Sequence, residues 1–387
     1  MSALKSPQGA NSVTQVFDAV TFSGFHIKND KKLIPEQLVA YFLSFLPFQD
    51  VFNSRIVSKY LRKCSRMVTI VNVVDFGTNF QTSNLRKILK RFDIIKSLTI
   101  DNCTDIDNKL LADIVARAQG ANAIDFQNLF SRDLRTLIIL NGFGQQLQSL
   151  KLSGTSFLQK ETRTFLASCM TNALRVVHLN GFRTILGEDI KSIFANAPNL
   201  EEASFEDCSQ INVVRFEASS LRRLSFARCV CLTGIHVSNL SSLENLDISN
   251  CRSLEAANFN QLISKSNLKK LVSINMGFCS KVTTVAISDE NPMPCLESMD
   301  LEGCTSLISV NLTHVPNLSV IKLGMCLELQ SINLVSNRIV DLDVSMLPNL
   351  TGVTLDCINL KKFDCAGSKV TRDAVLGSLE TDRTTTL

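Results

Sequence analysis

The sequence lacks several features that would point to particular classes of protein. It has no tryptophan, only two tyrosines, and four scattered histidines without metal-ligand spacing. The 40 lysines and arginines barely exceed the 36 aspartates and glutamates, and this weak balance does not favour a nucleic-acid or membrane partner. No apolar run approaches the roughly 20 residues that cross a bilayer. No glycine-rich phosphate loop is present. We therefore expect no membrane span, no metal and no cofactor.

The composition is typical of a large folded protein. The chain has 387 residues, of which 45% are hydrophobic and 20% charged, enough to bury a core and too apolar for wholesale disorder. Residues 1–32 lack the apolar stretch of a secretory signal, so we expect a flexible leader. The number of cysteines, 13, is odd, and the cysteines follow a repeat instead of the pattern of a small disulfide-linked domain. This usage favours the reducing cytoplasm or nucleus.

An internal repeat dominates residues 71–369. Each unit has apolar residues at positions 1, 4 and 6, followed by cysteine or asparagine at position 9. Units can be started at 71, 95, 121, 147, 174, 200, 221, 243, 271, 296, 318, 339 and 360. The ninth position holds cysteine in seven units: Cys103, Cys208, Cys229, Cys251, Cys279, Cys304 and Cys326. A random distribution of the cysteines would place fewer than one there, so the repeat is not a product of apolar composition.

The spacing inside each unit predicts one short strand, and successive strands should stack in parallel. Positions 4 and 6 alternate around an exposed position 5, which is strand periodicity. Position 9 turns the chain away from the sheet, where a small thiol can be buried and form weak hydrogen bonds to the backbone. The pattern resembles the cysteine-containing class of leucine-rich repeat and implies an α/β leucine-rich repeat solenoid.

The return leg of each unit is predicted to change along the chain. Apolar residues have helical spacing in three return legs: 106–118, 161–170 and 188–195. After residue 200 they alternate as in strands, for example at 307–312 and 329–334. We therefore expect helix-backed N-terminal repeats and mostly extended return legs after residue 200.

The end of the repeat region allows two alignments. Leu350, Val353 and Leu355 also fit the first positions of the template, which leaves the register near 339–365 open. We expect residues 370–387 to form a C-terminal cap and tail, because terminal repeats need a cover.

Residues 33–66 do not follow the repeat. Pro35 and Glu36 suit the first turn of a helix whose apolar face includes Leu38 and Phe42. The segment predicts two or three short helices with more apolar surface than they can bury among themselves. This is more typical of a partner-docking motif than of a free-standing domain.

This segment resembles the F-box family. The matching residues are Leu33, Pro35, Glu36, Leu38, the run Phe42-Leu43-Ser44-Phe45-Leu46-Pro47, Asp50 and Val57-Ser58-Lys59. The resemblance, followed directly by the repeats, implies a substrate-recognition subunit of a Skp–cullin–F-box ubiquitin ligase. The segment would bind a Skp-type adaptor, and the repeats would hold a protein substrate without supplying a catalytic group. The candidate adaptor contacts are Leu33, Pro35, Leu38, Phe42, Leu46, Val51 and Val57.

Substrate binding is expected at the exposed positions 2, 3, 5, 7 and 8 of the repeats. Acids in the repeat that starts at 200 neighbour arginines in the next, which indicates either mutual neutralisation or a partner site. Position 5 holds aspartate in four later repeats, a column that suits a basic segment. Position 8 holds apolar residues in three repeats, as in a binding hot spot or a patch that packs against a cap or loop. The candidate substrate-binding residues are Arg222, Arg223, Arg228, Asp247, Phe278, Asp300, Met325 and Asp343.

Two other functions stay open. A repeat scaffold that binds proteins without a ubiquitin role would use residues 33–66 as a cap on its first strand. An enzyme would need a reactive cysteine such as Cys169 or Cys295, which lie off the repeat position, but no histidine or acid nearby in sequence is placed to activate either. The pair Cys229 and Cys231 offers too few ligands for a metal site.

Overall fold

The computed structural model describes residues 43, 63–64, 70–74, 97–101, 121–127, 146–153 and 169–371. The chain forms two compact units, residues 1–146 and 147–387. In the first unit, β1 (Ile70–Val74), β2 (Ser97–Asp101) and β3 (Ala123–Gln127) pair in parallel and in chain order.

In the second unit, each repeat contributes one strand to a parallel series. The strands, in order of pairing, are β4 (Ser149–Ser153), β5 (Val176–Asn180), β6 (Glu202–Ser204), β8 (Arg223–Ser225), β10 (Asn245–Asp247), β11 (Ser273–Asn275), β13 (Ser298–Asp300) and β15 (Val320–Lys322). A parallel pair of the same kind follows, β17 (Asp341–Asp343) and β19 (Lys362–Asp364). Position 4 of each repeat aligns with position 4 of the next, as in Leu224, Leu246 and Ile274. The predicted strand register is therefore confirmed in these repeats.

The first repeat departs from its predicted register. A start at residue 71 would put Val74 at position 4, but Val71 is the residue that pairs with Leu98, which holds position 4 of the second repeat. The repeat therefore begins three residues earlier than predicted. The sequence could not separate the two alignments, because Val68, Val71, Val73 and Val74 offer apolar residues to both.

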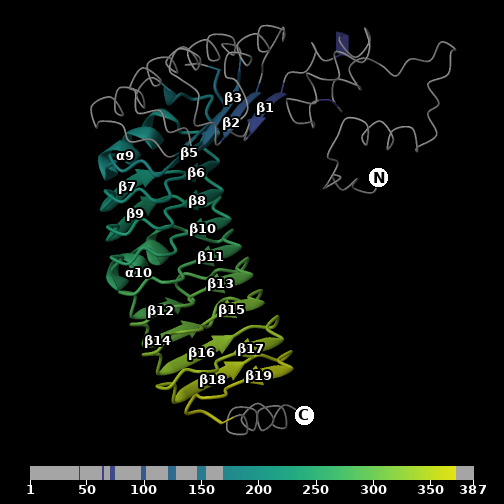
Figure 1. Ribbon diagram of the computed structural model, residues 1–387. Helices are drawn as coiled ribbons and strands as arrows, with labels where there is room; N and C mark the ends of the chain where they lie inside the picture. Colours follow the sequence, from purple (N-terminus) through teal and green to yellow (C-terminus); the bar gives the residue numbers. More distant parts are fainter. Residues whose placement is uncertain are drawn as a thin grey trace, which may run out of the picture. The chain divides into compact units, whose positions relative to one another are not determined.

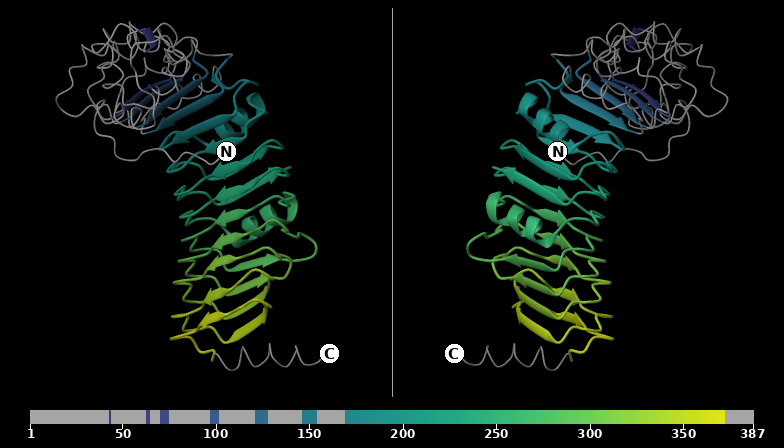
Figure 2. Two further views of the ribbon diagram at one scale, coloured as in Figure 1. Left: turned by 90° about the vertical axis from the view of Figure 1, so that its right-hand side faces the viewer. Right: turned by 90° about the vertical axis from the view of Figure 1, so that its left-hand side faces the viewer.

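The return legs form a second column beside the strands (Figures 1 and 2). Its members are α9 (Gly187–Asn196), β7 (Val213–Glu217), β9 (Gly234–Ser238), α10 (Ala256–Lys265), β12 (Thr284–Ile287), β14 (Ser309–Leu312), β16 (Ser331–Val335) and β18 (Gly352–Asp356). The strands β7 and β9 pair in parallel, and β12, β14, β16 and β18 form a four-stranded parallel sheet. The fold of this unit is a parallel β-solenoid. The helix predicted at 188–195 and the extended return legs after residue 200 are confirmed, with one exception.

That exception is α10, a helix in a region predicted to be extended. Its residues Phe259, Leu262 and Ile263 are buried at helical spacing. The repeat that contains α10 runs from 243 to 270, longer than the repeats of 21 or 22 residues with extended return legs. A helix rises about 1.5 Å per residue against about 3.3 Å in a strand, so the longer repeat was the signal for a helix.

The ambiguous register near the C-terminal end is settled by β18. Val353 in β18 pairs with Ile332 in β16, which places residues 350–355 in a return leg. The last repeats therefore start at 339 and 360.

The core lies between the two columns and contains a chain of phenylalanines. Phe194 in α9 stacks on Phe216 in β7, with 3.9 Å between ring centroids, and meets Phe205 edge-on at 6.5 Å. Phe205 in turn stacks on Phe226 at 5.4 Å. Because these rings come from strand legs and return legs of neighbouring repeats, they join the repeats into one packed interior.

Several predictions fall on residues outside the described part of the chain. These are the leader 1–32, the seven candidate adaptor contacts, Cys103, the helix predicted at 106–118, residues 161–168 of the helix predicted at 161–170, and residues 372–387. Within the F-box-like segment, Leu43, Lys63 and Cys64 are described. All three are helical, and Leu43 and Cys64 are buried. None of the helices described here has the length and apolar content needed to cross a bilayer.

Candidate protein-binding site

A ladder of buried thiols fixes the turn after each strand. The six described cysteines at position 9 are buried, and each Sγ donates a hydrogen bond to the carbonyl at position 6 of the preceding repeat. The Sγ–O distances lie between 3.0 Å for Cys229 and 3.3 Å for Cys304. The burial and weak hydrogen bonds predicted for this position are therefore observed. Burial raises the pKa of the Cys304 thiol to about 11 and that of Cys229 to about 12.

These pKa shifts give a testable prediction of thiol reactivity. At pH 8 we expect iodoacetamide to label the exposed Cys231 and Cys295 at least about a hundredfold faster than the six ladder thiols, which are buried and protonated. Peptide mass spectrometry of the native full chain, with a urea-unfolded sample as control, measures this. Labelling of Cys251 in the native chain as fast as Cys231 would reject the ladder.

The residue before each thiol has a left-handed backbone. Among the described residues, position 8 is glycine in three repeats, Gly181, Gly303 and Gly367, and another residue in six: Asp207, Arg228, Asn250, Phe278, Met325 and Met346. The φ of these six lies between 57° and 63°. In seven of these nine repeats the backbone N–H of position 8 donates to the carbonyl of position 7 in the next repeat, as from Phe278 to Glu302 at 2.7 Å. A left-handed conformation costs a non-glycine residue about 1–2 kcal/mol, so the stacked turns impose it.

Three of these left-handed residues are apolar and exposed, and we call them the apolar edge: Phe278, Met325 and Met346. Their exposed fractions are 40%, 54% and 71%. A β-carbon at Gly303 would overlap the Phe278 ring, and one at Gly367 would lie 2.9 Å from Met346 Sδ. Phe278 and Met346 therefore each lean over the glycine at position 8 of the next repeat.

The predicted aspartate column at position 5 caps the turns. In four repeats an aspartate Oδ1 accepts a hydrogen bond from the backbone N–H two residues later: Asp247 from Ser249 (2.9 Å), Asp300 from Glu302 (3.0 Å), Asp343 from Ser345 (2.8 Å) and Asp364 from Ala366 (3.0 Å). Partner contact is the only role that we predicted for these residues from the sequence. The signal for the cap was aspartate or asparagine two residues before the start of a turn, which is typical of an Asx turn.

The second oxygen of these carboxylates has varied surroundings. Asp247 Oδ2 accepts a hydrogen bond from Asn275 at 3.4 Å, and Asp300 Oδ2 pairs with Lys322 Nζ at 2.8 Å. Hydrogen bonds from Ser345 lower the pKa of Asp343. The column is thus partly occupied by contacts within the chain.

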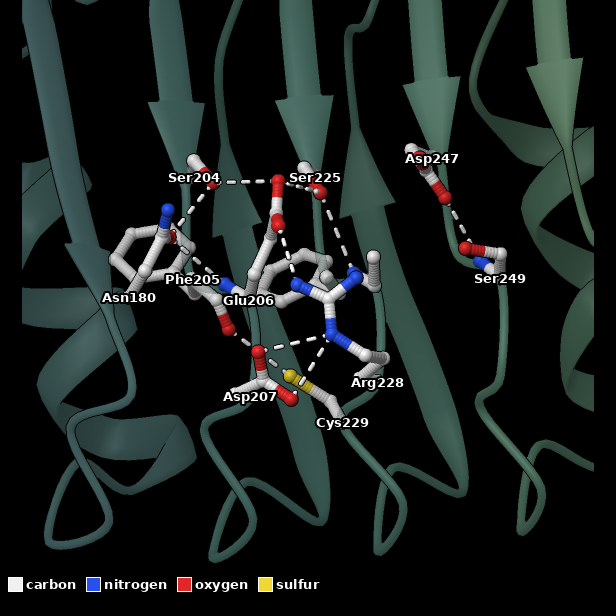
Figure 3. A network of polar contacts seen from close by, with 12 residues as sticks. Asn180, Ser204, Phe205, Glu206, Asp207, Ser225, Arg228, Cys229, Asp247 and Ser249 are labelled. Atoms are coloured by element: carbon white, nitrogen blue, oxygen red, sulfur yellow. Dashed lines mark hydrogen bonds and ion pairs between the residues drawn. The ribbon is translucent and has the colours of Figure 1, made fainter. Parts of the chain in front are cut away.

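Opposite charges neutralise one another around β6 and β8. Arg228 contacts Glu206 through Nη2 at 2.8 Å and Asp207 through Nε at 2.9 Å (Figure 3). The network continues from Glu206 through Ser204 and Ser225, two residues that the sequence analysis did not single out. Exposed ion pairs of this kind contribute little to stability, but they neutralise the charges that a partner would otherwise contact.

A second chain of charges lies on the same face. Glu202 accepts hydrogen bonds from Arg223 Nε at 2.8 Å and from His178 Nε2 at 2.6 Å. Burial alone would raise the pKa of Glu202, but the hydrogen bonds from Arg223 and His178 lower it below its ordinary value. Arg222 pairs with Glu244 at 2.7 Å. All three candidate arginines are therefore in ion pairs within the chain, which is the neutralising arrangement that the sequence left open; their role in substrate binding stays a prediction.

The structure places the other candidate residues on the repeats that start at 243, 271, 296, 318 and 339. Glu302, which the sequence analysis missed, lies among them. A β-carbon at Gly324 would lie 3.6 Å from Glu302 Cγ, so this half-buried side chain extends toward the repeat that carries Met325. Among the described residues, neither Glu302 nor Asp247 forms an ion pair.

Comparisons with known proteins show distant likenesses. No protein-family model matches the chain, and no curated protein matches it either. The solved structure of a Rad7 and Elc1 complex in yeast has a TM-score of 0.40 and 12% identity, and the match covers 88% of this chain and 96% of that one. The leucine-rich repeat domain of the type III effector XCV3220 (XopL) has a TM-score of 0.27 and 11% identity, covering 76% and 97%.

A further solved structure is the functional domain of InlJ from Listeria monocytogenes, which includes a cysteine ladder. Its TM-score is 0.26 and its identity 14%, and the match covers 70% of this chain and 64% of that one. Likenesses of this size assign neither a family nor a function. The fold described above depends on the strand pairing and burial of this chain alone.

Proposed function

We propose that the chain is a non-catalytic substrate-recognition subunit of a Skp–cullin–F-box ubiquitin ligase. Residues 33–66 bind a Skp-type adaptor, and the leucine-rich repeats bind a protein substrate in the cytosol or nucleus. The chain acts by positioning, since it raises the local concentration of substrate near the ubiquitin carrier. The observation that carries the receptor role is the exposed apolar edge on a rigid parallel β-solenoid.

The side chains of the solenoid support binding over catalysis. The ladder thiols are buried and have raised pKa values, which suits structural cysteines. Of the two cysteines named above as examples of a nucleophile, Cys169 is buried and Cys295 is exposed. His178 is bound to the Glu202 carboxylate.

The surface supports a protein ligand. Repeats stack into a continuous face whose backbone hydrogen bonds are satisfied by neighbouring repeats, so the side chains decide what binds. Exposed apolar residues bordered by carboxylates, as at Phe278 and Met325, are typical of a protein-binding hot spot.

Affinity capture of the intact tagged chain, followed by quantitative mass spectrometry, tests the proposal. We expect peptides of a Skp-type adaptor and of a cullin at levels well above those from an untagged control. Capture of other proteins without adaptor or cullin would reject the ubiquitin role and favour the simpler repeat scaffold.

A further inference from the structure

The residues of the apolar edge lie at position 8, where glycine or asparagine would adopt the left-handed backbone with less conformational strain. Position 8 holds glycine at 181, 303 and 367 and asparagine at 250, all with the same left-handed backbone. Glycine adopts this conformation without strain, and asparagine tolerates it far better than phenylalanine or methionine. The turn geometry therefore does not require Phe278, Met325 or Met346. Strained residues of this kind are characteristic of binding sites, where the side chain serves an external ligand.

Burial does not explain these residues either. Met325 and Met346 are more than half exposed, and 40% of Phe278 stays exposed although its ring lies over Gly303. An exposed methionine in a strained conformation adds little to the stability of the isolated chain. Its apolar surface gains free energy only when a partner covers it.

The three side chains lie close enough to contact one partner segment. They follow β11, β15 and β17, which lie on successive repeats with β13 between the first two (Figure 1). Neighbouring strands are about 4.8 Å apart, so Phe278 and Met325 are separated by about 10 Å and Met346 lies about 5 Å further on. An extended segment in the polyproline II conformation has three residues per turn and rises about 3.1 Å per residue, so two of its side chains three residues apart lie on one face and match the longer distance.

The charges next to the edge are negative. Glu302 belongs to the repeat between Phe278 and Met325, and its side chain extends toward Gly324, the neighbour of Met325. Asp343 lies three residues before Met346. Among the described residues of β11, β13, β15 and β17, Lys322 is the one cation; it is paired with Asp300, and its charge also acts on Glu302. A partner that covers the edge must therefore bring positive charge to Glu302.

We propose that the apolar edge and Glu302 form a docking site for an extended protein segment that carries a lysine or arginine between two apolar side chains. The two apolar residues cover Phe278 and Met325, and the basic residue pairs with Glu302. This inference rests on the proposed function, because it names the class of substrate segment that the repeats recognise.

Two synthetic peptide libraries test this site directly. One has the fixed pattern Leu-x-Lys-Leu, the other Leu-x-Glu-Leu, and both have the same random flanks. Binding to the purified intact chain is measured by fluorescence polarisation. We expect the lysine library to bind at least about tenfold more tightly, and the E302Q variant to lose most of this preference. Equal binding of the two libraries would overturn the proposal.

Variants of the edge separate binding from folding. The double variant F278N/M325N should reduce binding of the lysine library about tenfold or more without lowering the midpoint of urea unfolding, because asparagine suits the left-handed backbone. The single variant M325N should act in the same direction with a smaller loss. The matched control I308N removes an apolar side chain of similar exposure from a return leg and should leave binding unchanged.

The outcomes also separate this inference from the proposed function. Unchanged peptide binding by F278N/M325N would overturn the docking site, whereas capture of a Skp-type adaptor by the same variant is independent of it. Failure of the wild-type chain to capture a Skp-type adaptor would instead reject the ubiquitin-ligase role.

Discussion

Replacing Phe226 with alanine is expected to lower the free energy of unfolding by about 3–5 kcal/mol, as for other fully buried phenylalanines. Phe226 has no exposed surface and stacks on Phe205, through which it joins the phenylalanine chain between the two columns. Its carbonyl also accepts the hydrogen bond from the Cys251 thiol. The cavity would therefore disturb the core and the ladder together. Urea unfolding of the full chain, followed by far-ultraviolet circular dichroism, measures the change.

The cavity in F226A should also change the shape of the urea-unfolding transition. Each repeat contacts only its neighbours, so a weak repeat in the middle of a solenoid uncouples the two sides. We expect F226A to unfold over a broader range of urea concentration than wild type. The control F278A makes the same chemical change at an exposed ring and should cost about 1 kcal/mol or less. Equal losses for the two variants would contradict the assigned core.

Introducing aspartate at Leu38 and Phe42 together is expected to weaken capture of a Skp-type adaptor by more than about a hundredfold. Each side chain is a candidate contact on the apolar face of the F-box-like segment, and a hot-spot residue is worth about 2 kcal/mol or more. A buried carboxylate without a partner adds a further penalty. Titration of the purified chain with a purified adaptor measures the loss.

Two variants on polar residues of the same segment serve as the matched control. Gln37 and Ser44 lie on the opposite side of the predicted helix, so Q37D/S44D should bind the adaptor within about threefold of wild type. Both double variants should keep the urea midpoint of the repeats. If L38D/F42D still binds the adaptor as wild type does, the F-box interpretation of residues 33–66 is wrong.

The strand legs were predictable because burial alternates within them. Leu224, Leu246 and Ile274 are buried at position 4 between half-buried or exposed residues, so a spacing rule finds both the strand and its register. The thiols were found for a related reason, since a small buried group is needed at one place in every turn. The helix α10 was missed because its apolar spacing was given less weight than the alternation in later repeats.

The candidate site was predictable only in part. Phe278 and Met325 were found because apolar residues at exposed positions are unusual. Their left-handed backbone was not predicted, since phenylalanine and methionine rarely adopt it; the signal was the glycine or asparagine at the same position in other repeats, such as Gly303 and Asn250. The contribution of Glu302 depends on contacts across repeats, which one sequence does not show.

In the proposed function, the chain links an adaptor at residues 33–66 to a substrate at the repeats. Size-exclusion chromatography of the purified full chain, a Skp-type adaptor and a fluorescent Leu-x-Lys-Leu peptide tests this link in one measurement. We expect all three to elute together, with the peptide lost for F278N/M325N and the adaptor lost for L38D/F42D. Elution of the chain without the adaptor, or displacement of the peptide by the adaptor, would contradict this link.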